Sequence, residues 1–162
     1  NQQWSPQIQI GVAVLLPGDY VSDLSVRLAL YRRLAAIEEA DEIDGFAAEL
    51  IDRFGPLPES AEYLLRVVRI KQLCRRASID QIDAGHKGAV LGFRDNVFAA
   101  PEELIKLISE SNGKLRVRPD QKLVFSEEWP TAETRFVGLT NLVEKMLSLI
   151  STNSGDPFDA SD

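Results

Sequence analysis

Apolar and polar positions in the N-terminal half follow patterns typical of one strand and then helices. Residues 8–17 first alternate and then become continuously apolar, which predicts a strand with a buried end. From residue 22 to 39 the spacing becomes helical. Its apolar positions form one stripe with a second row beside it: Leu24, Leu28, Tyr31 and Ala35, then Leu30, Leu34 and Ile37. We therefore expect a strand followed by a helix with a broad apolar side.

The clearest helical pattern covers residues 41–54, where one apolar face is continuous. Its members are Ile43, Phe46, Ala47, Leu50, Ile51 and Phe54. Asp41 is a suitable N-cap residue, and Gly55 followed by Pro56 ends the helix. Pro58 begins a third helix, expected to end at Ala77. Its basic residues are expected to point mostly outward: Arg66, Arg69, Lys71, Arg75 and Arg76.

The C-terminal half has mainly strand patterns, with two further helices. Strands are expected at residues 79–83, 89–94, 114–118 and 122–125, with turns at residues 85–88 and 119–121. Helices are expected from Pro101 to Ile108 and over residues 130–150. Because helices and strands are segregated along the chain, the fold class is α+β, with a small, mostly antiparallel sheet. A helical N-terminal half would pack with this sheet and a C-terminal helix.

A single domain over residues 8–150 accounts for all these elements. Residues 1–7 and 151–162 are polar and are expected to be flexible tails, the second of them acidic. No apolar run approaches the ~18 residues that cross a bilayer. The only cysteine, Cys74, cannot form an internal disulfide, which is typical of a cytoplasmic protein.

The charge balance disfavours nucleic acid as a direct partner. The chain carries 25 acidic and 18 basic residues, a net charge of −7. Nucleic-acid binders usually have a basic surface, so an acidic chain is expected to bind a basic protein partner instead. The basic residues at positions 66–76 keep one alternative open, a binding module for RNA polymerase or DNA. Without interleaved aromatic residues, this stripe is more typical of a solvated helix face.

Residues for catalysis, cofactors or metals are scarce. The chain has no phosphate-binding glycine loop of the Walker type, and His86 is its only histidine. A small hydrolase using Cys74 and His86 is conceivable. However, Cys74 lies in the apolar part of a helix, whereas a nucleophilic thiol requires a partly exposed electropositive setting. We therefore expect no catalytic residues, no cofactor and no metal site.

The acidic residues near the second helix are the most informative charged group. Seven acids and no base occur from Glu38 to Asp52, and most of them lie where the helix dipole favours them. Glu49 and Asp52 instead lie near the C-terminal end, off the apolar face. They could form a solvated face with Glu49 paired to Arg53, an acidic edge that receives arginines from a partner, or a general acid/base pair.

Three segments of the chain resemble the C-terminal domain of bacterial transcription-repair coupling factors. These segments are residues 15–23 (LLPGDYVSD), 27–35 (RLALYRRLA) and 49–58 (ELIDRFGPLP). The resemblance extends over residues 8–150.

This resemblance implies a specific function, which the composition alone does not indicate. Proteins of this family are large ATP-dependent DNA translocases of nucleotide excision repair that act on stalled RNA polymerase. Their C-terminal domain docks on an N-terminal excinuclease-B-like module and masks the surface with which this module binds excinuclease A. The family's contact residues correspond here to Glu49, Asp52 and Arg53. The resemblance thus implies a non-catalytic, autoinhibitory interaction domain of a bacterial cytoplasmic protein.

Overall fold

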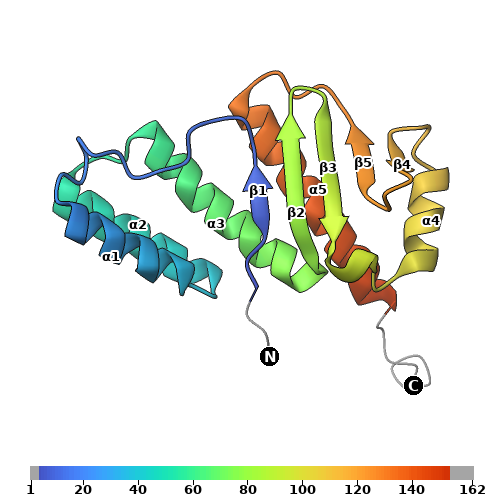
Figure 1. Cartoon of the computed structure of the whole chain (residues 1–162), viewed down its shortest axis with the longest axis horizontal. Coiled ribbons are helices and arrows are strands. Elements are labelled where there is room, and N and C mark those ends of the chain that lie inside the picture. Colours follow the sequence, from blue (N-terminus) through green and yellow to red (C-terminus); the bar gives the residue numbers. More distant parts are fainter. Residues whose placement is uncertain (1–3, 154–162) are drawn as a thin grey trace. The chain divides into compact units, whose positions relative to one another are not determined.

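The computed structural model describes residues 4–153 and divides the chain into two compact units. The helical unit comprises residues 12–72, and the sheet unit joins the residues up to Gly11 to those from Leu73 onward. Helix α3 (Glu59–Ala77) belongs to the helical unit up to residue 72 and to the sheet unit beyond it. Figure 1 shows the elements of each unit.

The helical unit is built from α1 (Leu24–Ala35), α2 (Ala40–Phe54) and the first part of α3. The Asp23 side chain caps α1 by accepting a hydrogen bond from the backbone N–H of Val26. A capping box begins α2, in which Glu39 is the N-cap residue and the Glu42 side chain accepts a hydrogen bond from the Glu39 N–H. The predicted N-cap, Asp41, is therefore wrong, because it lies inside the first turn of α2.

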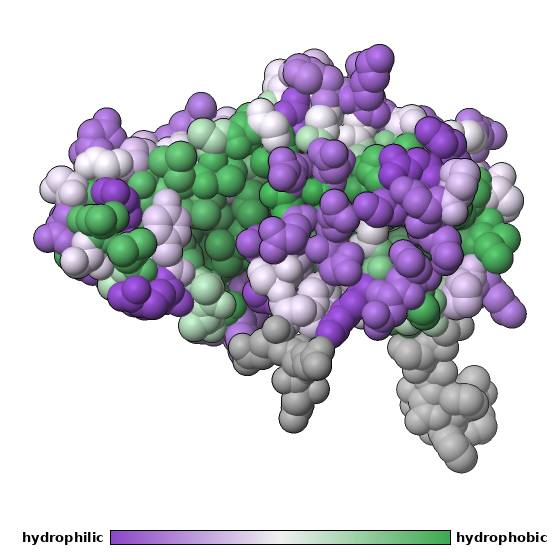
Figure 2. All heavy atoms as spheres, in the orientation of Figure 1, coloured by the Kyte–Doolittle hydropathy of each residue, from purple (hydrophilic) through white to green (hydrophobic). Residues whose placement is uncertain are grey.

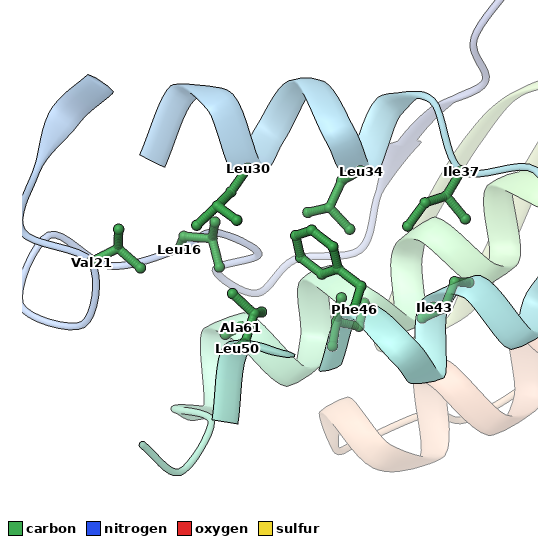
Figure 3. Packing of buried hydrophobic residues seen from close by; sticks show 10 residues of the cluster. Leu16, Val21, Leu30, Leu34, Ile37, Ile43, Phe46, Leu50 and Ala61 are labelled. Carbon is green, nitrogen blue, oxygen red and sulfur yellow. The ribbon is translucent and has the colours of Figure 1, made fainter. Parts of the chain in front are cut away.

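Buried apolar side chains from all three helices fill the helical unit. Figure 3 shows Leu30, Leu34 and Ile37 pointing from the α1 side toward Phe46 and Leu50 of α2. Leu16 and Val21 also enter this core from the segment before α1. Burying each such side chain contributes about 1.5–3 kcal/mol, so this cluster is the main stabilising element of the unit.

Two predicted features of this unit are wrong, namely the length of the first strand and one member of the α2 face. The structure also decides between the two apolar rows of α1. The predicted first strand covers residues 8–17, but β1 covers only Gln7–Gln9, because Gly11 takes a positive φ of 75° and the next residues run toward the helical core. On α1 the second apolar row faces inward, whereas Leu24 and Leu28 are exposed. On α2, Ile51 is also exposed rather than part of the buried face.

A five-stranded sheet forms the centre of the sheet unit, in the order β1-β2-β3-β5-β4. Strand β1 pairs parallel with β2 (Ile79–Gly85), and all other pairings are antiparallel. The other strands are β3 (Gly88–Phe93), β4 (Leu115–Val117) and β5 (Leu123–Ser126), with a short 3₁₀ turn η1 (Arg94–Asn96) after β3. The α+β class and the mostly antiparallel sheet are thus confirmed.

One face of this sheet is covered by α5 (Ala132–Asn153), which passes behind β2 and β3 in Figure 1. Ile82 of β2 and Phe136 and Met146 of α5 are fully buried. The opposite face carries exposed Gln9 and Asp83, and Figure 2 shows mainly hydrophilic side chains over the strands on that side. Helix α4 (Pro101–Ser109) precedes β4 and contacts it.

A buried arginine fastens β1 to α5 in a way that the sequence did not predict. Arg135 is only 4% exposed, and its Nη1 donates a hydrogen bond to the carbonyl oxygen of Ile10 at 2.7 Å. Its Nη2 lies 3.4 Å from the carbonyl oxygen of Trp129. Arg135 therefore fixes the end of β1, directly before the chain enters the helical unit.

The first and last described residues can be compared with the predicted flexible tails. Gln7 is paired with Gln81 in the sheet, and α5 continues to Asn153, three residues into the expected C-terminal tail. Residues 1–3 and 154–162 lie outside the described part, and the 8–150 domain limits stay a prediction. Between residues 4 and 153, no helix is long and apolar enough to span a membrane.

Candidate protein-interaction site

The predicted site residues lie on the exposed side of α2, near its C-terminal end. Glu49, Asp52 and Arg53 are spaced at i, i+3 and i+4, so their side chains share one side of the helix. Leu50, between them, points into the core and is fully buried. We refer to Glu49, Asp52 and Arg53, together with Arg33 of α1, as the charged face. The capping box and the buried side of α2 hold this helix in place.

Glu49 is held by two arginines. Arg33 donates from Nη1 to Oε2 at 2.6 Å and from Nη2 to Oε1 at 2.7 Å. Arg53 donates from Nη1 to the same Oε2 at 2.9 Å. A bidentate arginine–carboxylate pair is among the stronger charge-assisted hydrogen bonds. Both carboxylate oxygens of Glu49 are therefore occupied from within the chain.

These contacts shift the titration of both partners. Hydrogen bonds from Arg33 and then Arg53 lower the pKa of Glu49 from 4.5 to about 2. The hydrogen bond to Glu49 raises the pKa of Arg33 above its ordinary value. A general acid would require a raised pKa in this carboxyl group. The shift is in the opposite direction, so the geometry does not support the acid/base pair that the sequence left open.

Aromatic rings hold both guanidinium groups in place. The Arg33 guanidinium carbon lies 5.1 Å from the centroid of the Phe46 ring, and that of Arg53 lies 4.9 Å from the centroid of Phe54. Cation–π contacts at exposed sites contribute about 0.5–1 kcal/mol each. The two arginines therefore remain half-exposed while their conformations are restricted.

Asp52 differs from Glu49 in its surroundings. Its side chain is exposed, and no ion pair or hydrogen bond joins it to the residues at positions 4–153. The predicted acidic edge is therefore reduced to one unpaired carboxylate, Asp52, beside a carboxylate that is ion-paired with two arginines.

A shallow depression lies beside the charged face, between the end of α1 and the first half of α2. Its lining residues are Arg33, Ala36, Ile37, Glu42, Gly45, Phe46 and Glu49. A Cβ added at Gly45 would meet nothing within 4 Å, so the floor of the depression is open. Such a shallow surface suits contact with a protein better than enclosure of a small molecule.

The basic residues of α3 are less exposed than expected. Only Arg69 and Arg76 are exposed, whereas Arg66, Lys71 and Arg75 are half-buried. Arg69 also donates a hydrogen bond to Gln72 at 3.2 Å. The outward basic stripe is therefore shorter than predicted, and its binding to DNA or polymerase stays a prediction.

The residues of the alternative hydrolase do not form an accessible nucleophile. Cys74 is fully buried in α3, whereas His86 is exposed in the turn between β2 and β3. Within residues 4–153, no group of three or more His, Cys, Asp or Glu side chains is placed to hold a metal ion.

Sequence reasoning missed Arg33 as a member of the site. It lies 16 positions before Glu49, on another helix, so no local spacing rule connects them. The sequence did contain one useful signal. Arg33 lies three positions after Leu30 on α1, so once the Leu30 row is known to face inward, Arg33 is expected on the side of the helix near α2. The sequence described two apolar rows on this helix and did not decide which of them faces inward.

A family model for the TRCF domain matches residues 10–104. The chain belongs to the TRCF domain family. Among curated relatives, the transcription-repair-coupling factor of Rickettsia bellii is 39% identical over 125 residues, and that of Escherichia coli strain K12 is 30% identical over 129 residues. These matches cover 77% and 80% of this chain. The chain spans about 11% of the length of either relative.

A solved structure supports the same fold for this TRCF domain. The C-terminal domain of a transcription-repair coupling factor superposes with a TM-score of 0.69 at 20% sequence identity. The match covers 94% of this chain and 99% of the other. The predicted resemblance to this C-terminal domain is therefore confirmed at the level of family and fold.

Proposed function

We propose that this chain is a regulatory interaction domain that acts by docking its charged face onto another module of the same protein. The partner would be an N-terminal excinuclease-B-like module. While docked, the chain would mask the surface that this module offers to excinuclease A. The parent protein would be an ATP-dependent DNA translocase of transcription-coupled repair, and this chain would contribute regulation to it.

The observation that carries this proposal is the charged face on α1 and α2. Its two guanidinium groups are held by Glu49 and by the rings of Phe46 and Phe54. The buried Leu50 anchors α2 beneath them. Preorganised charged groups reduce the entropy cost of binding. The face belongs to a chain in the TRCF domain family, whose curated relatives carry the name transcription-repair-coupling factor.

Direct docking can be measured by mixing this chain with the separately expressed N-terminal module. We expect a saturable complex whose affinity falls as salt is raised, because charged contacts are screened beyond a Debye length of ~8–10 Å. Replacing Glu49→Lys and Asp52→Lys together should weaken the complex at least about tenfold, a change of roughly 1.4 kcal/mol.

A matched control is available on the same helix. Asp41→Lys together with Asp44→Lys makes the same charge change at two exposed acids of α2 outside the charged face. This pair should alter affinity only slightly. Equal weakening by both pairs would indicate general charge attraction and would contradict docking through the charged face.

The masking part of the proposal requires the parent protein. Reversal of Glu49 and Asp52 in that protein should increase its capture of purified excinuclease A. The Asp41 and Asp44 reversal should leave capture unchanged. If the reversal at the charged face has no effect on capture, the masking role is wrong even where docking itself is observed.

A further inference from the structure

We propose that Arg33 and Arg53 receive a carboxylate from the docking partner, so that the charged face binds a surface with both an acidic and a basic side chain. This inference rests on the docking proposed above and specifies the chemistry of the partner surface. It also adds Arg33, on α1, to the residues that determine specificity. Within the chain, the acceptor oxygens of Glu49 already have hydrogen-bond partners, whereas several N–H donors of the two arginines do not. This difference carries the inference.

Glu49 is a poor primary acceptor for a partner's arginine. Its Oε1 accepts from Arg33, and its Oε2 accepts from both Arg33 and Arg53. An incoming guanidinium would have to displace one of these, replacing one charge-assisted pair by another with little net gain. The occupied carboxylate therefore works mainly as an anchor for the two arginines.

The guanidinium groups, in contrast, retain unused donors. A guanidinium has five N–H groups, and the bidentate bond from Arg33 uses one on each terminal nitrogen. Arg53 uses a single N–H of Nη1 toward Glu49. Neither arginine makes another hydrogen bond within residues 4–153, and their side chains are 50% and 42% exposed. The edge formed by Nε and one terminal nitrogen matches the spacing of a second carboxylate.

Both arginines are also restrained before any partner arrives. The Glu49 bridge and the rings of Phe46 and Phe54 fix their orientation. A planar guanidinium that is already held loses less conformational entropy on forming a further pair than a free side chain does. This is the arrangement expected of a prepared anion-binding pair rather than of a loosely solvated helix face.

Asp52 supplies the opposite charge beside this pair. It is exposed and, among the described residues, has no ion-pair partner. The charged face therefore holds two cations, Arg33 and Arg53, and two anions, Glu49 and Asp52, which sum to zero. Only a partner with both charges can complement it, with an acidic group on the arginines and a basic group on Asp52.

The decisive variant is Arg33→Gln, because the two models predict opposite signs. If the partner carboxylate binds Arg33, this variant should weaken the complex with the N-terminal module about tenfold. If the partner offers only basic groups, loss of Arg33 leaves Oε1 of Glu49 open to them, while Arg53 still donates to Oε2, and should tighten the complex. Arg53→Gln should weaken binding in the same direction. Arg33→Lys should also weaken it, since an ammonium group cannot form the bidentate contact.

Controls separate this inference from the docking on which it rests. Arg32→Gln makes the same change at the adjacent exposed position of α1 and should leave affinity unchanged. Thermal unfolding by circular dichroism checks that each variant is folded. Wild-type affinity retained or increased in both Arg33→Gln and Arg53→Gln overturns the carboxylate contact. If the Glu49 and Asp52 reversal still weakens binding in that case, the docking stands. Failure of the wild-type chain to bind the module overturns both.

Discussion

Glu49 lies between two guanidinium groups from different helices, and this placement determines its protonation. The hydrogen bonds from Arg33 and Arg53 favour the charged carboxylate and lower its pKa to about 2. A carboxyl group with a lowered folded-state pKa stabilises the fold above its ordinary pKa of 4.5, and this contribution is lost as pH falls toward 2.

Glu49→Gln should therefore reduce stability in a pH-dependent way. The free energy of unfolding should fall by about 1 kcal/mol or less above pH 4.5, because both partners are partly exposed. The difference from wild type should shrink as pH falls toward 2. Urea titrations followed by circular dichroism measure it. The pKa of Asp120 is also lowered to about 2, by Arg118, so only the difference between the two proteins isolates Glu49. A constant difference across this range would contradict the assigned contacts.

Contacts between residues far apart in sequence limited what could be predicted at this scale. The i, i+4 pair of Glu49 and Arg53 follows from helical spacing and is confirmed. Arg33 and Glu49 are 16 positions apart, and Arg135 and Ile10 are 125 apart. Such pairs depend on how helices and strands pack, which periodicity does not specify.

Among the elements, α1 shows why two adjacent apolar rows are difficult to assign. Leu24 and Leu28 share a stripe with Tyr31, and Leu30 and Leu34 form the row beside it. Both rows have helical spacing, so the pattern alone leaves the inward side undecided. Packing against the α2 side of the core selects the Leu30 row. The positions of the other helices were largely predictable because prolines and glycines lie near many of their ends, although the N-cap of α2 was predicted wrongly.

The orientation of α1 can be tested with the same substitution, leucine to alanine, at one inward and one outward position of the helix. Leu34→Ala should reduce the free energy of unfolding by about 2–5 kcal/mol, since Leu34 is 4% exposed in a packed core. Leu28→Ala, on the same helix but 46% exposed, should change it by less than about 0.5 kcal/mol. Chemical denaturation measures both. Similar losses in the two variants would contradict the orientation of α1.

At the scale of the whole molecule, the residues fall into two compact units, while the single domain over residues 8–150 stays a prediction. A length of 162 residues and one continuous set of elements predicted one domain. The helical unit nevertheless buries its own cluster, and the sheet unit buries another around Phe136 and Met146. Helix α3 belongs to both, and an unbroken helix carries no boundary signal such as a glycine- or proline-rich linker.

Separate cores should show separate local stability. Leu50→Ala removes a fully buried side chain of the helical unit. We expect hydrogen exchange to accelerate in α1, α2 and the first part of α3, while strands β2, β3 and β5 retain their protection. Mass spectrometry of exchanged peptides measures this pattern. Leu91→Ala in β3 is the reciprocal control. Uniform acceleration along the chain would indicate one cooperative unit.

The packing of Trp129 against Gly138 has a consequence for how this protein is studied by optical spectroscopy. A Cβ at Gly138 would come within 2.3 Å of the indole, so the ring is tightly enclosed, and it is 2% exposed. The other tryptophan, Trp4, stacks with Arg94 in the same unit. Both intrinsic indole fluorophores therefore report on the sheet unit. A thermal unfolding experiment followed by tryptophan fluorescence would therefore detect unfolding of the sheet unit. It would not detect unfolding of residues 12–72, which contain the charged face. A tryptophan introduced into the helical unit would be needed to follow the part of the chain proposed to dock.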